Sequence, residues 1–199
     1  YDNVDDAVAY TYQDQGHLFY TINFPSANAT WVYDLSMGMW HERGQWNADA
    51  MEYEVWGPEY HAYAFDKHLV GDPCNGLIYN MSTNVFTDVD GKGLRRQRIP
   101  PILQSEQTRI FLDRFQLPPV VTSSDQGYDP QIMLQLSRDG GITWGSERWR
   151  SAGKMGEYLH RAQWWRLGSG RNLLPSVTMT DPVPWRILDA YINVKGGAH

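Results

Sequence analysis

A pattern of eleven residues occurs twice in the first half of the chain, at an offset of 46 residues. Residues 32–42 align without gaps on residues 78–88; two positions are identical and most others keep their chemical character. Glycine and asparagine, the residue types that most readily adopt positive φ, share one position. Each copy therefore predicts a hairpin whose tight turn joins a strand with tyrosine to a strand with tryptophan or phenylalanine. The repeat is carried by Tyr33, Gly38, Trp40, Tyr79, Asn84 and Phe86.

The length of this repeat is typical of a β-propeller blade, because four-stranded blades recur at ~40 to 50 residues with a large aromatic residue between neighbouring sheets. Residues 1–91 are thus predicted to form two propeller-like blades, although two hairpins could also share such a pattern by chance. Known propellers close with ~4 to 8 blades, and an open pair leaves strand edges unpaired. We therefore expect a fragment of a larger propeller, whose other blades come from sequence before Tyr1 or from the later part of the chain.

Strand-like runs succeed one another at short intervals, separated by turn-forming residues such as Gly16 and Pro25. Spacing of ~8 to 12 residues is typical of antiparallel sheets and leaves no room for the crossover helices of βαβ units. The aromatic share of 14% agrees, since aromatic side chains favour strands. The sequence predicts an all-β fold, with strand candidates at residues 7–12, 17–22, 30–35, 110–117, 130–137, 161–167, 176–180 and 185–194.

Residues 92–199 are predicted to form a separate C-terminal β region, either further blades or a sandwich. A basic segment at residues 93–98 opens it, and Pro100 and Pro101 stiffen the chain beyond, as at a domain boundary. The basic segment has two interpretations. It is either a docking or phosphate-facing site, or the solvated edge of a sheet whose charges prevent unwanted pairing.

Residues 137–144 match the Asp-box pattern S-x-D-x-G-x-T-W, carried by Ser137, Asp139, Gly141, Thr143 and Trp144. The Asp139 carboxylate can accept hydrogen bonds from amides of its own loop, and the glycines supply unusual dihedral angles. Trp144 can then pack beneath the hairpin that the motif closes. The pattern predicts a structural turn without a reactive group.

Asp boxes are best known from sialidase-like propellers, so an Asp-box glycosidase is an alternative. It would need two carboxylates, or a tyrosine with a carboxylate, facing one another across a cleft. A carbohydrate-binding propeller is a third possibility, with Trp46, Trp56 and Tyr60 as candidate groove residues. We predict no catalytic residue, because the sequence pairs none of the available acids, which are Asp5, Asp6, Glu42, Glu52, Glu54, Glu59 and Asp88.

No metal or cofactor is expected. The histidines lack metal-ligand spacing, and His61 and His68 are predicted to lie in a loop. A net charge of -6 argues against tight nucleic-acid binding, which needs clustered lysine and arginine. Cys74 is the only cysteine, so no intrachain disulfide can form. No run approaches the ~18 apolar residues of a membrane span, and no membrane partner is expected.

The order of several segments resembles the packaged-DNA stabilisation, or tail-hub, proteins of short-tailed bacteriophages. In the C-terminal half the segments are residues 136–144, 147–158, 161, 165–168 and 181–183, and in the first half residues 7–12, 19–20, 30–34 and 38–43. The resemblance therefore covers nearly the whole chain. It departs at residues 172–175, where the family pattern leads us to expect an arginine-rich strand. We expect Pro175 to break a central ladder and to leave this segment at an edge or in a loop.

The resemblance implies a structural protein of the virion tail, assembled in the host cytoplasm, and not an enzyme. It implies a homo-oligomeric ring, a hexamer, below the portal and its adaptor. This ring closes the tail channel, retains packaged DNA and conducts it during ejection. The implied partners are other copies of the chain, the portal–tail adaptor, the tail needle or spike, and genome DNA that passes without specific binding.

Overall fold

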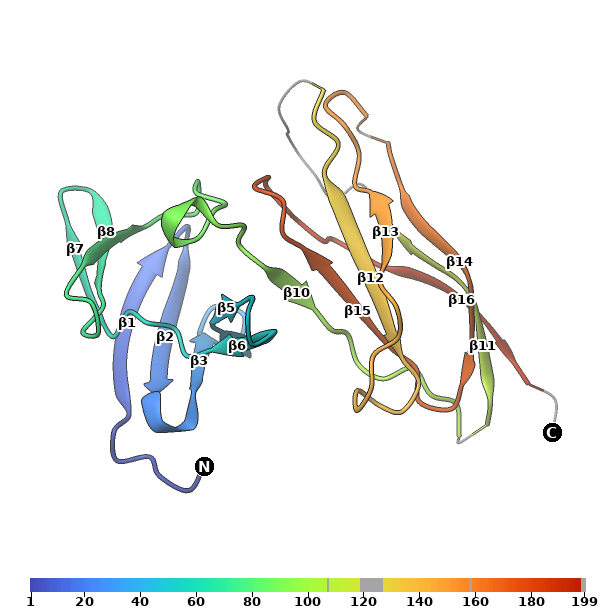
Figure 1. The fold of residues 1–199 in the computed structure, drawn as a ribbon, viewed down its shortest axis with the longest axis horizontal. Helices are drawn as coiled ribbons and strands as arrows, with labels where there is room; N and C mark the ends of the chain where they lie inside the picture. Colours follow the sequence, from blue (N-terminus) through green and yellow to red (C-terminus); the bar gives the residue numbers. More distant parts are fainter. Residues whose placement is uncertain (107, 119–126, 158, 198–199) are drawn as a thin grey trace. The chain divides into compact units, whose positions relative to one another are not determined.

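The computed structural model describes residues 1–106, 108–118, 127–157 and 159–197 of the chain (Figure 1). Within these ranges the regular structure consists of sixteen β-strands and two short 3-10 helices, which confirms the all-β prediction. No helix in the described ranges is long and apolar enough to cross a bilayer. Tyr158 and His199, which belong to segments named above, lie outside the described residues.

The chain divides into two compact units, Tyr1–Thr83 and Asn84–His199. These are the first unit and the second unit. Their boundary falls before residue 91, where the sequence led us to expect a change of domain. It also passes through the second copy of the repeat, so that copy does not belong to one folded unit.

A four-stranded antiparallel sheet begins the first unit. Gln15 and Gly16 form its first turn, and their φ angles of 47° and 84° are those of the two-residue turn that suits twisted hairpins. Alternation along the third strand buries Thr30, Val32 and Asp34, so one face of the sheet is turned inward. The strands lie in the order β1 (Val8–Asp14), β2 (His17–Phe24), β3 (Ala29–Asp34) and β4 (Met39–Arg43), with a 3-10 helix, η1 (Pro25–Ala27), before β3.

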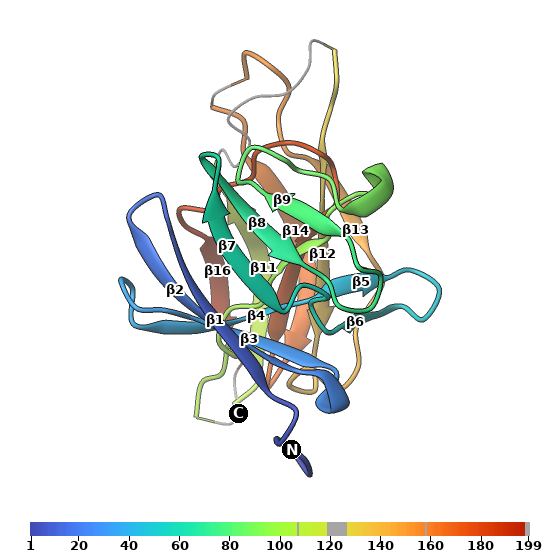
Figure 2. The ribbon, with the colours of Figure 1, turned by 90° about the vertical axis from the view of Figure 1, so that its left-hand side faces the viewer.

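Two smaller antiparallel sheets complete the first unit (Figure 2). The chain leading to them is fixed to the inward face of the four-stranded sheet, because Nδ2 of Asn23 donates to the carbonyl oxygens of Pro58 at 2.9 Å and Trp56 at 3.3 Å. The strands are β5 (Gln45–Asn47) with β6 (Glu52–Glu54), and β7 (Tyr60–Ala64), β8 (Lys67–Gly71) and β9 (Ile78–Met81).

The two copies of the repeat differ in structure, which corrects the prediction of two alike hairpins. The first copy is the β3–β4 hairpin, whereas the second is β9 followed by a turn, with Val85 and Phe86 outside any strand. Asn84 does not adopt positive φ. After this turn the chain pairs locally, through a bridge from Thr87 to Gly93 and a 3-10 helix, η2 (Val89–Gly91), and so no fourth strand is added to β9.

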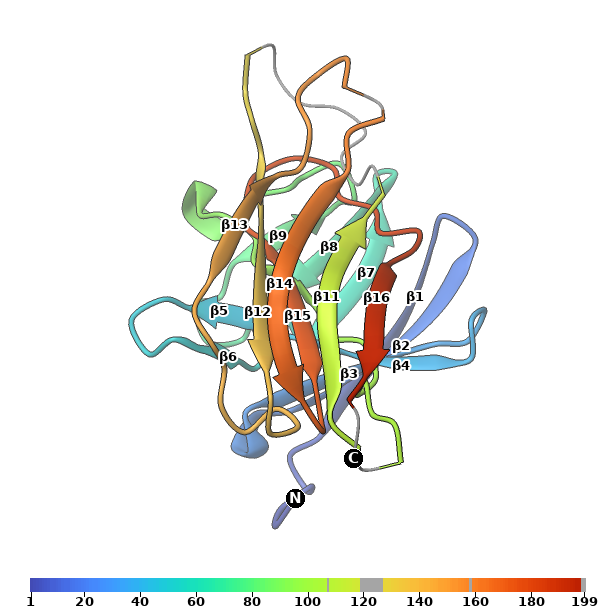
Figure 3. The same cartoon turned by 90° about the vertical axis from the view of Figure 1, so that its right-hand side faces the viewer.

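The second unit is a β-sandwich of two antiparallel sheets (Figure 3). Of the two alternatives predicted for residues 92–199, the sandwich is therefore correct, because these strands form two facing sheets and not further blades. One sheet has the order β10 (Arg96–Arg98), β15 (Leu174–Met179), β12 (Gln131–Ser137) and β13 (Arg148–Ser151). The other has the order β14 (Ala162–Gly170), β11 (Ile110–Leu117) and β16 (Tyr191–Gly196).

One apolar core fills the space between these sheets. Phe115 and Trp164 contribute from one sheet, and Ile132, Leu134 and Val177 from the other. The Trp164 ring is fully buried, and its indole N–H donates to the carbonyl oxygen of Arg148 at 2.8 Å. The largest core side chain is therefore held by packing and by a satisfied hydrogen bond.

Pro175 lies inside β15, an interior strand of its sheet, and not in the edge or loop expected from the sequence. The sheet tolerates the proline because β15 has a neighbouring strand on only one side at this residue. On one side Pro175 faces Leu136 of β12, whereas β10 pairs with β15 only from Val177 onward. A residue without an amide hydrogen is acceptable where the strand has one partner.

Candidate assembly surfaces

The loop between β12 and β13 is organised by the Asp139 carboxylate. It accepts hydrogen bonds from the hydroxyl of Ser137 at 2.6 Å and from the amide and hydroxyl of Thr143 at 2.9 and 2.5 Å. The Gly141 amide donates to the Ser137 hydroxyl at 2.8 Å. The hydrogen bond from Ser137, followed by those from Thr143, holds the pKa of Asp139 well below its usual range. This carboxylate is committed to its own turn.

The same loop lies at the end of an antiparallel hairpin, because β12 and β13 pair directly. Gly140 and Gly141 have φ angles of 78° and 106°, which only glycine adopts easily. The Gly140 amide donates to the carbonyl oxygen of Asn172 at 3.3 Å, and the half-buried Trp144 lines a pocket together with Leu134 and Leu167. These contacts favour the structural role that the sequence suggested, and we propose it for the five motif residues.

The first repeat residues do meet across a hairpin. Tyr33 pairs with Trp40, their ring centroids lie 4.9 Å apart, and Gly38 takes the turn with φ of 66°. Trp40 is half exposed, so in the described chain its ring does not fill a space between sheets. In the second copy of the repeat, the Tyr79 hydroxyl accepts a hydrogen bond from the Asn75 side chain, and Asn84 lies in a turn.

Phe86 does not pair with the other repeat residues. It lies in the second unit, where its ring packs near the guanidinium of Arg96. The Arg96 guanidinium lies 5.9 Å from the Phe86 ring and 5.7 Å from the Trp185 ring, and donates to the carbonyl oxygens of Val183 and Asp181 at 2.7 and 2.5 Å. Burial lowers the pKa of Arg96. β10 is an edge strand, as one interpretation of the basic segment predicted, but Arg96 is not a solvated charge.

A cluster of aromatic and histidine rings in the first unit was not found from the sequence. The Arg43 guanidinium lies 5.6 Å from the Tyr12 ring and 5.8 Å from the Trp56 ring, and donates to the Tyr12 hydroxyl at 2.7 Å. These residues share no motif. Only the pairing of distant strands brings them together, so no local signal could have revealed the cluster.

His61 and His68 lie on β7 and β8, which corrects the prediction of a loop. Their ring nitrogens are 3.0 Å apart, and His61 stacks on Tyr10 with ring centroids 5.9 Å apart. Burial, and then the charge of His68, lowers the pKa of His61. Across the described residues no group of three or more His, Cys, Asp or Glu side chains is placed to hold a metal ion.

Several acids considered for catalysis have structural partners. Asp6 accepts from the Ser26 amide at 2.7 Å, Glu54 from the Asn47 amide group at 2.6 Å, and Asp88 from the Val89 amide at 2.8 Å. Asp5, Glu42 and Glu52 are exposed, and Glu59 is half-buried. None of these contacts pairs two acids.

The aromatic candidates for a glycan groove have separate surroundings. The Trp46 ring packs edge-on against Tyr53, with centroids 4.9 Å apart, and Trp56 faces Arg43. Tyr60 is largely exposed on β7. These contacts do not join the three side chains into a shared aromatic platform.

Charge is divided unequally between the two units. Residues 1–83 contain twelve Asp and Glu against two Lys and Arg, whereas residues 84–199 contain eleven against fifteen. The first unit is thus strongly acidic and the second basic. The overall charge of -6, on which the sequence argument about nucleic acid rested, conceals this division.

The β14–β11–β16 sheet faces the viewer in Figure 3. Its outer face, called the outer sheet face below, carries cross-strand rows of residues. Ser169, Phe111 and Lys195 form one row, and Trp165, Arg114 and Asn193 another. The third row is Gln163, Gln116 and Tyr191. Aromatic and cationic side chains therefore share this face of the sheet.

Comparison with known proteins identifies a family for the second half of the chain. The model of the family described as "Bacteriophage P22 Gp10, beta-sandwich" matches residues 95–195, just over half of the chain. That range begins one residue before β10 and ends within β16, so it coincides with the sandwich. No curated protein matches the chain.

Proposed function

Since this chain belongs to the bacteriophage P22 Gp10 β-sandwich family, a family of short-tailed phage tail proteins, we propose that it forms part of the tail hub, or nozzle, below the portal and its adaptor. It is a structural component of the virion tail. In the proposed role it closes the tail channel, retains the packaged DNA and conducts it during ejection. That role requires no catalytic residue and no cofactor.

The observation that carries this proposal is the agreement in extent between the family match and a complete sandwich. Each strand of the two sheets either contributes side chains to one core or is hydrogen-bonded to a strand that does. Such a module is rigid enough to serve as a structural part of an assembly. The Asp139 loop is consistent with this role, because its polar groups are used within the turn.

We further propose a homo-oligomeric ring, a hexamer, with the adaptor and the tail needle or spike as neighbours. The β1–β4 sheet is proposed as one blade of a propeller completed by other sequence. An acidic first unit suits a conduit, because carboxylates repel phosphate and let DNA pass without adhesion.

A stop codon at Trp31 in the phage that encodes this chain tests the proposal. We expect heads that fill with DNA but leave it open to nuclease, because the tail channel is not closed. The measurement is the nuclease-resistant fraction of packaged DNA, with the same phage grown in a suppressor host as the control. Infectious particles that lack the chain and protect their DNA would contradict the proposed role.

The glycosidase alternative is separated by a second measurement on the purified chain. If the proposal holds, the chain releases no sugar from host surface polysaccharide. If the chain does release sugar, and an Asp139→Asn or a Glu52→Gln variant does not, the chain is a glycosidase and the proposal is wrong.

A further inference from the structure

The outer sheet face exposes several large aromatic side chains. Phe111, Trp165 and Tyr191 are 45%, 49% and 50% exposed. Every residue of β16 is exposed, and β16 is an edge strand. Exposed aromatic residues on a sheet that ends in an unpaired strand edge are typical of a surface that is covered in an assembly.

A local irregularity in β14 adds a charge to this face. Trp164 and Leu167 are buried, whereas the two residues between them, Trp165 and Arg166, are both exposed. A regular strand would turn one of these two inward. Arg166 has a φ angle of 55°, and the pairing of β11 with β14 shifts register at this level, so both side chains point outward.

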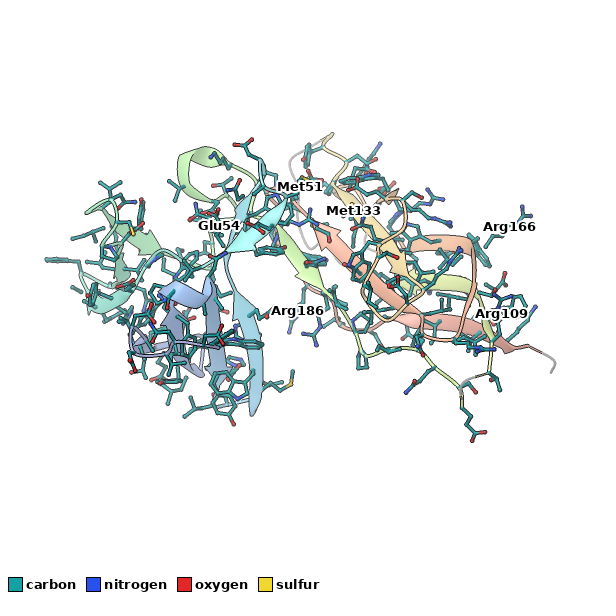
Figure 4. The ribbon with its side chains drawn as sticks, turned by 60° about the horizontal axis from the view of Figure 1, so that its bottom comes forward. Met51, Glu54, Arg109, Met133, Arg166 and Arg186 are labelled. Atoms are coloured by element: carbon teal, nitrogen blue, oxygen red, sulfur yellow. The ribbon has the colours of Figure 1, made fainter. Side chains whose placement is uncertain are left out.

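The cations on the outer sheet face lack acidic partners in the parts of the chain that the structure describes. Among these residues no carboxylate forms an ion pair with Arg109, Arg166 or Lys195. Figure 4 shows Arg109 and Arg166 on the same side of the second unit. The guanidinium carbon of Arg114 lies over the Trp165 ring, 5.2 Å from its centroid. Asp113, in the register shift of β11, is the one acid in the three strands.

The outer sheet face combines exposed aromatic residues with cations, and tryptophan, tyrosine, phenylalanine and arginine are the residues enriched in protein interfaces. Its partner must supply acids. The first unit of the same chain carries twelve acids against two bases, and exposes apolar residues beside them, as at Met51 and Glu52. Charge complementarity of this kind fixes which surfaces meet.

We propose that the outer sheet face binds the acidic first unit of a second copy of this chain. This inference rests on the proposed homo-oligomer and assigns its contact surfaces. The two surfaces differ, so the contact is head-to-tail, and repetition of such a contact closes a ring when the rotation allows it. The arrangement also covers the exposed edge of β16.

Nucleic acid is the less favoured partner for this face. Tight binding requires neutralisation of several phosphates, and one of the four cations, Arg114, is already engaged with the Trp165 ring. Binding of DNA is therefore an outcome that the experiment must be able to detect.

The first experiment measures self-association of the full chain by sedimentation at low and high salt. We expect oligomers that weaken with salt, because ~1 M salt shortens the screening length to ~3 Å. The double variant Arg166→Glu/Lys195→Glu should weaken association by about tenfold or more, since it replaces attraction by repulsion. The matched control, Lys92→Glu/Lys154→Glu, makes the same change of charge at two exposed lysines outside the sheet and should associate normally.

The second experiment identifies what covers the face. A photo-crosslinking residue at Phe111 should capture peptides from residues 1–83 of an isotopically labelled copy, whereas one at the exposed Ile142 should not. Capture of residues 84–199, or retention of DNA that is lost in the double variant, would overturn the assignment.

The two failures can be told apart. If the chain associates but the crosslinks lie elsewhere, the assigned face is wrong and the ring proposal stands. If the chain remains monomeric at low salt, both the face and the homo-oligomer are wrong, whereas the nuclease experiment on DNA retention still judges the tail role.

Discussion

The two units reach a compact fold by different means. Among the described residues the second unit buries sixteen apolar side chains, whereas the first buries Tyr12, Val32 and Val70. The first unit instead buries polar groups, among them Thr21, Asn23 and Asp34. Its interior depends on directed contacts, such as those of Arg43 with Tyr12 and of Asn23 with backbone carbonyls.

The two kinds of interior predict different behaviour for each unit alone. A core of apolar side chains provides stability within one module, because the apolar surface is removed from water by contacts inside that module. A network of polar and aromatic contacts is stable only when all its members are in place. We therefore expect the second unit to unfold as an independent, more stable module, and the first to gain stability from contacts in an assembly.

Trp164→Ala gives the largest expected effect. It should lower the free energy of unfolding of the second unit by about 3–5 kcal/mol, because it removes a fully buried ring and leaves its cavity. Calorimetry should show one transition shifted down and the other unchanged. Trp165→Ala is the matched control, because this half-exposed neighbour lies on the outer sheet face; its loss should affect stability little but weaken self-association. Equal shifts of both transitions would show that the units unfold together.

The sequence predicted the sandwich strands better than their arrangement. Residues 110–117 became β11 with the expected bounds, because its apolar and aromatic residues are decisive at short range. The second repeat failed for the opposite reason. Its pattern at Val85 and Phe86 suits a strand, but a strand also needs a neighbour, and the chain turns into the second unit.

The candidate sites show the same limit. The loop contacts of Asp139 join residues at most four positions apart and were predictable from the motif. Arg96 bonds with carbonyls of Asp181 and Val183, which are far along the chain, and it therefore appeared to be a surface charge. The outer sheet face was missed because its rows join three strands whose register no local pattern specifies.

Arg43→Ala tests the first unit and should have the next largest effect. It removes a hydrogen bond with the Tyr12 hydroxyl and two contacts with aromatic faces, at an expected cost of about 1–3 kcal/mol. Chemical unfolding followed by tryptophan fluorescence would measure it. Lys67→Ala, which removes an exposed cation of the same unit, is the control and should be neutral. A neutral Arg43→Ala would show that the first unit does not depend on this network.

Acidification should lower the stability of the first unit, by less than the Arg43→Ala substitution does. The pKa of His61 lies below its usual 6.5, because burial and His68 disfavour its charged form. The unfolded chain then binds a proton that the folded unit does not, so stability is lost as the pH falls below about 6.5. The transition of the first unit should move down between pH ~7.5 and ~5.5. His61→Phe, which keeps a ring without a proton site, should flatten this slope; an unchanged slope would assign it to other groups.

Asp139→Ala should have the smallest effect, and a local one. Although its carboxylate receives several hydrogen bonds, the side chain is exposed, so water can replace much of what the substitution removes. The global transition of the second unit should hardly move, while amide hydrogen exchange at Gly141 and Thr143 becomes faster. Asp139→Asn, which keeps one acceptor oxygen, should preserve part of the protection. A fall of the global transition as large as that of Trp164→Ala would mean that this turn and the sandwich core form one cooperative structure, and that the contrast between the units does not lie in the core alone.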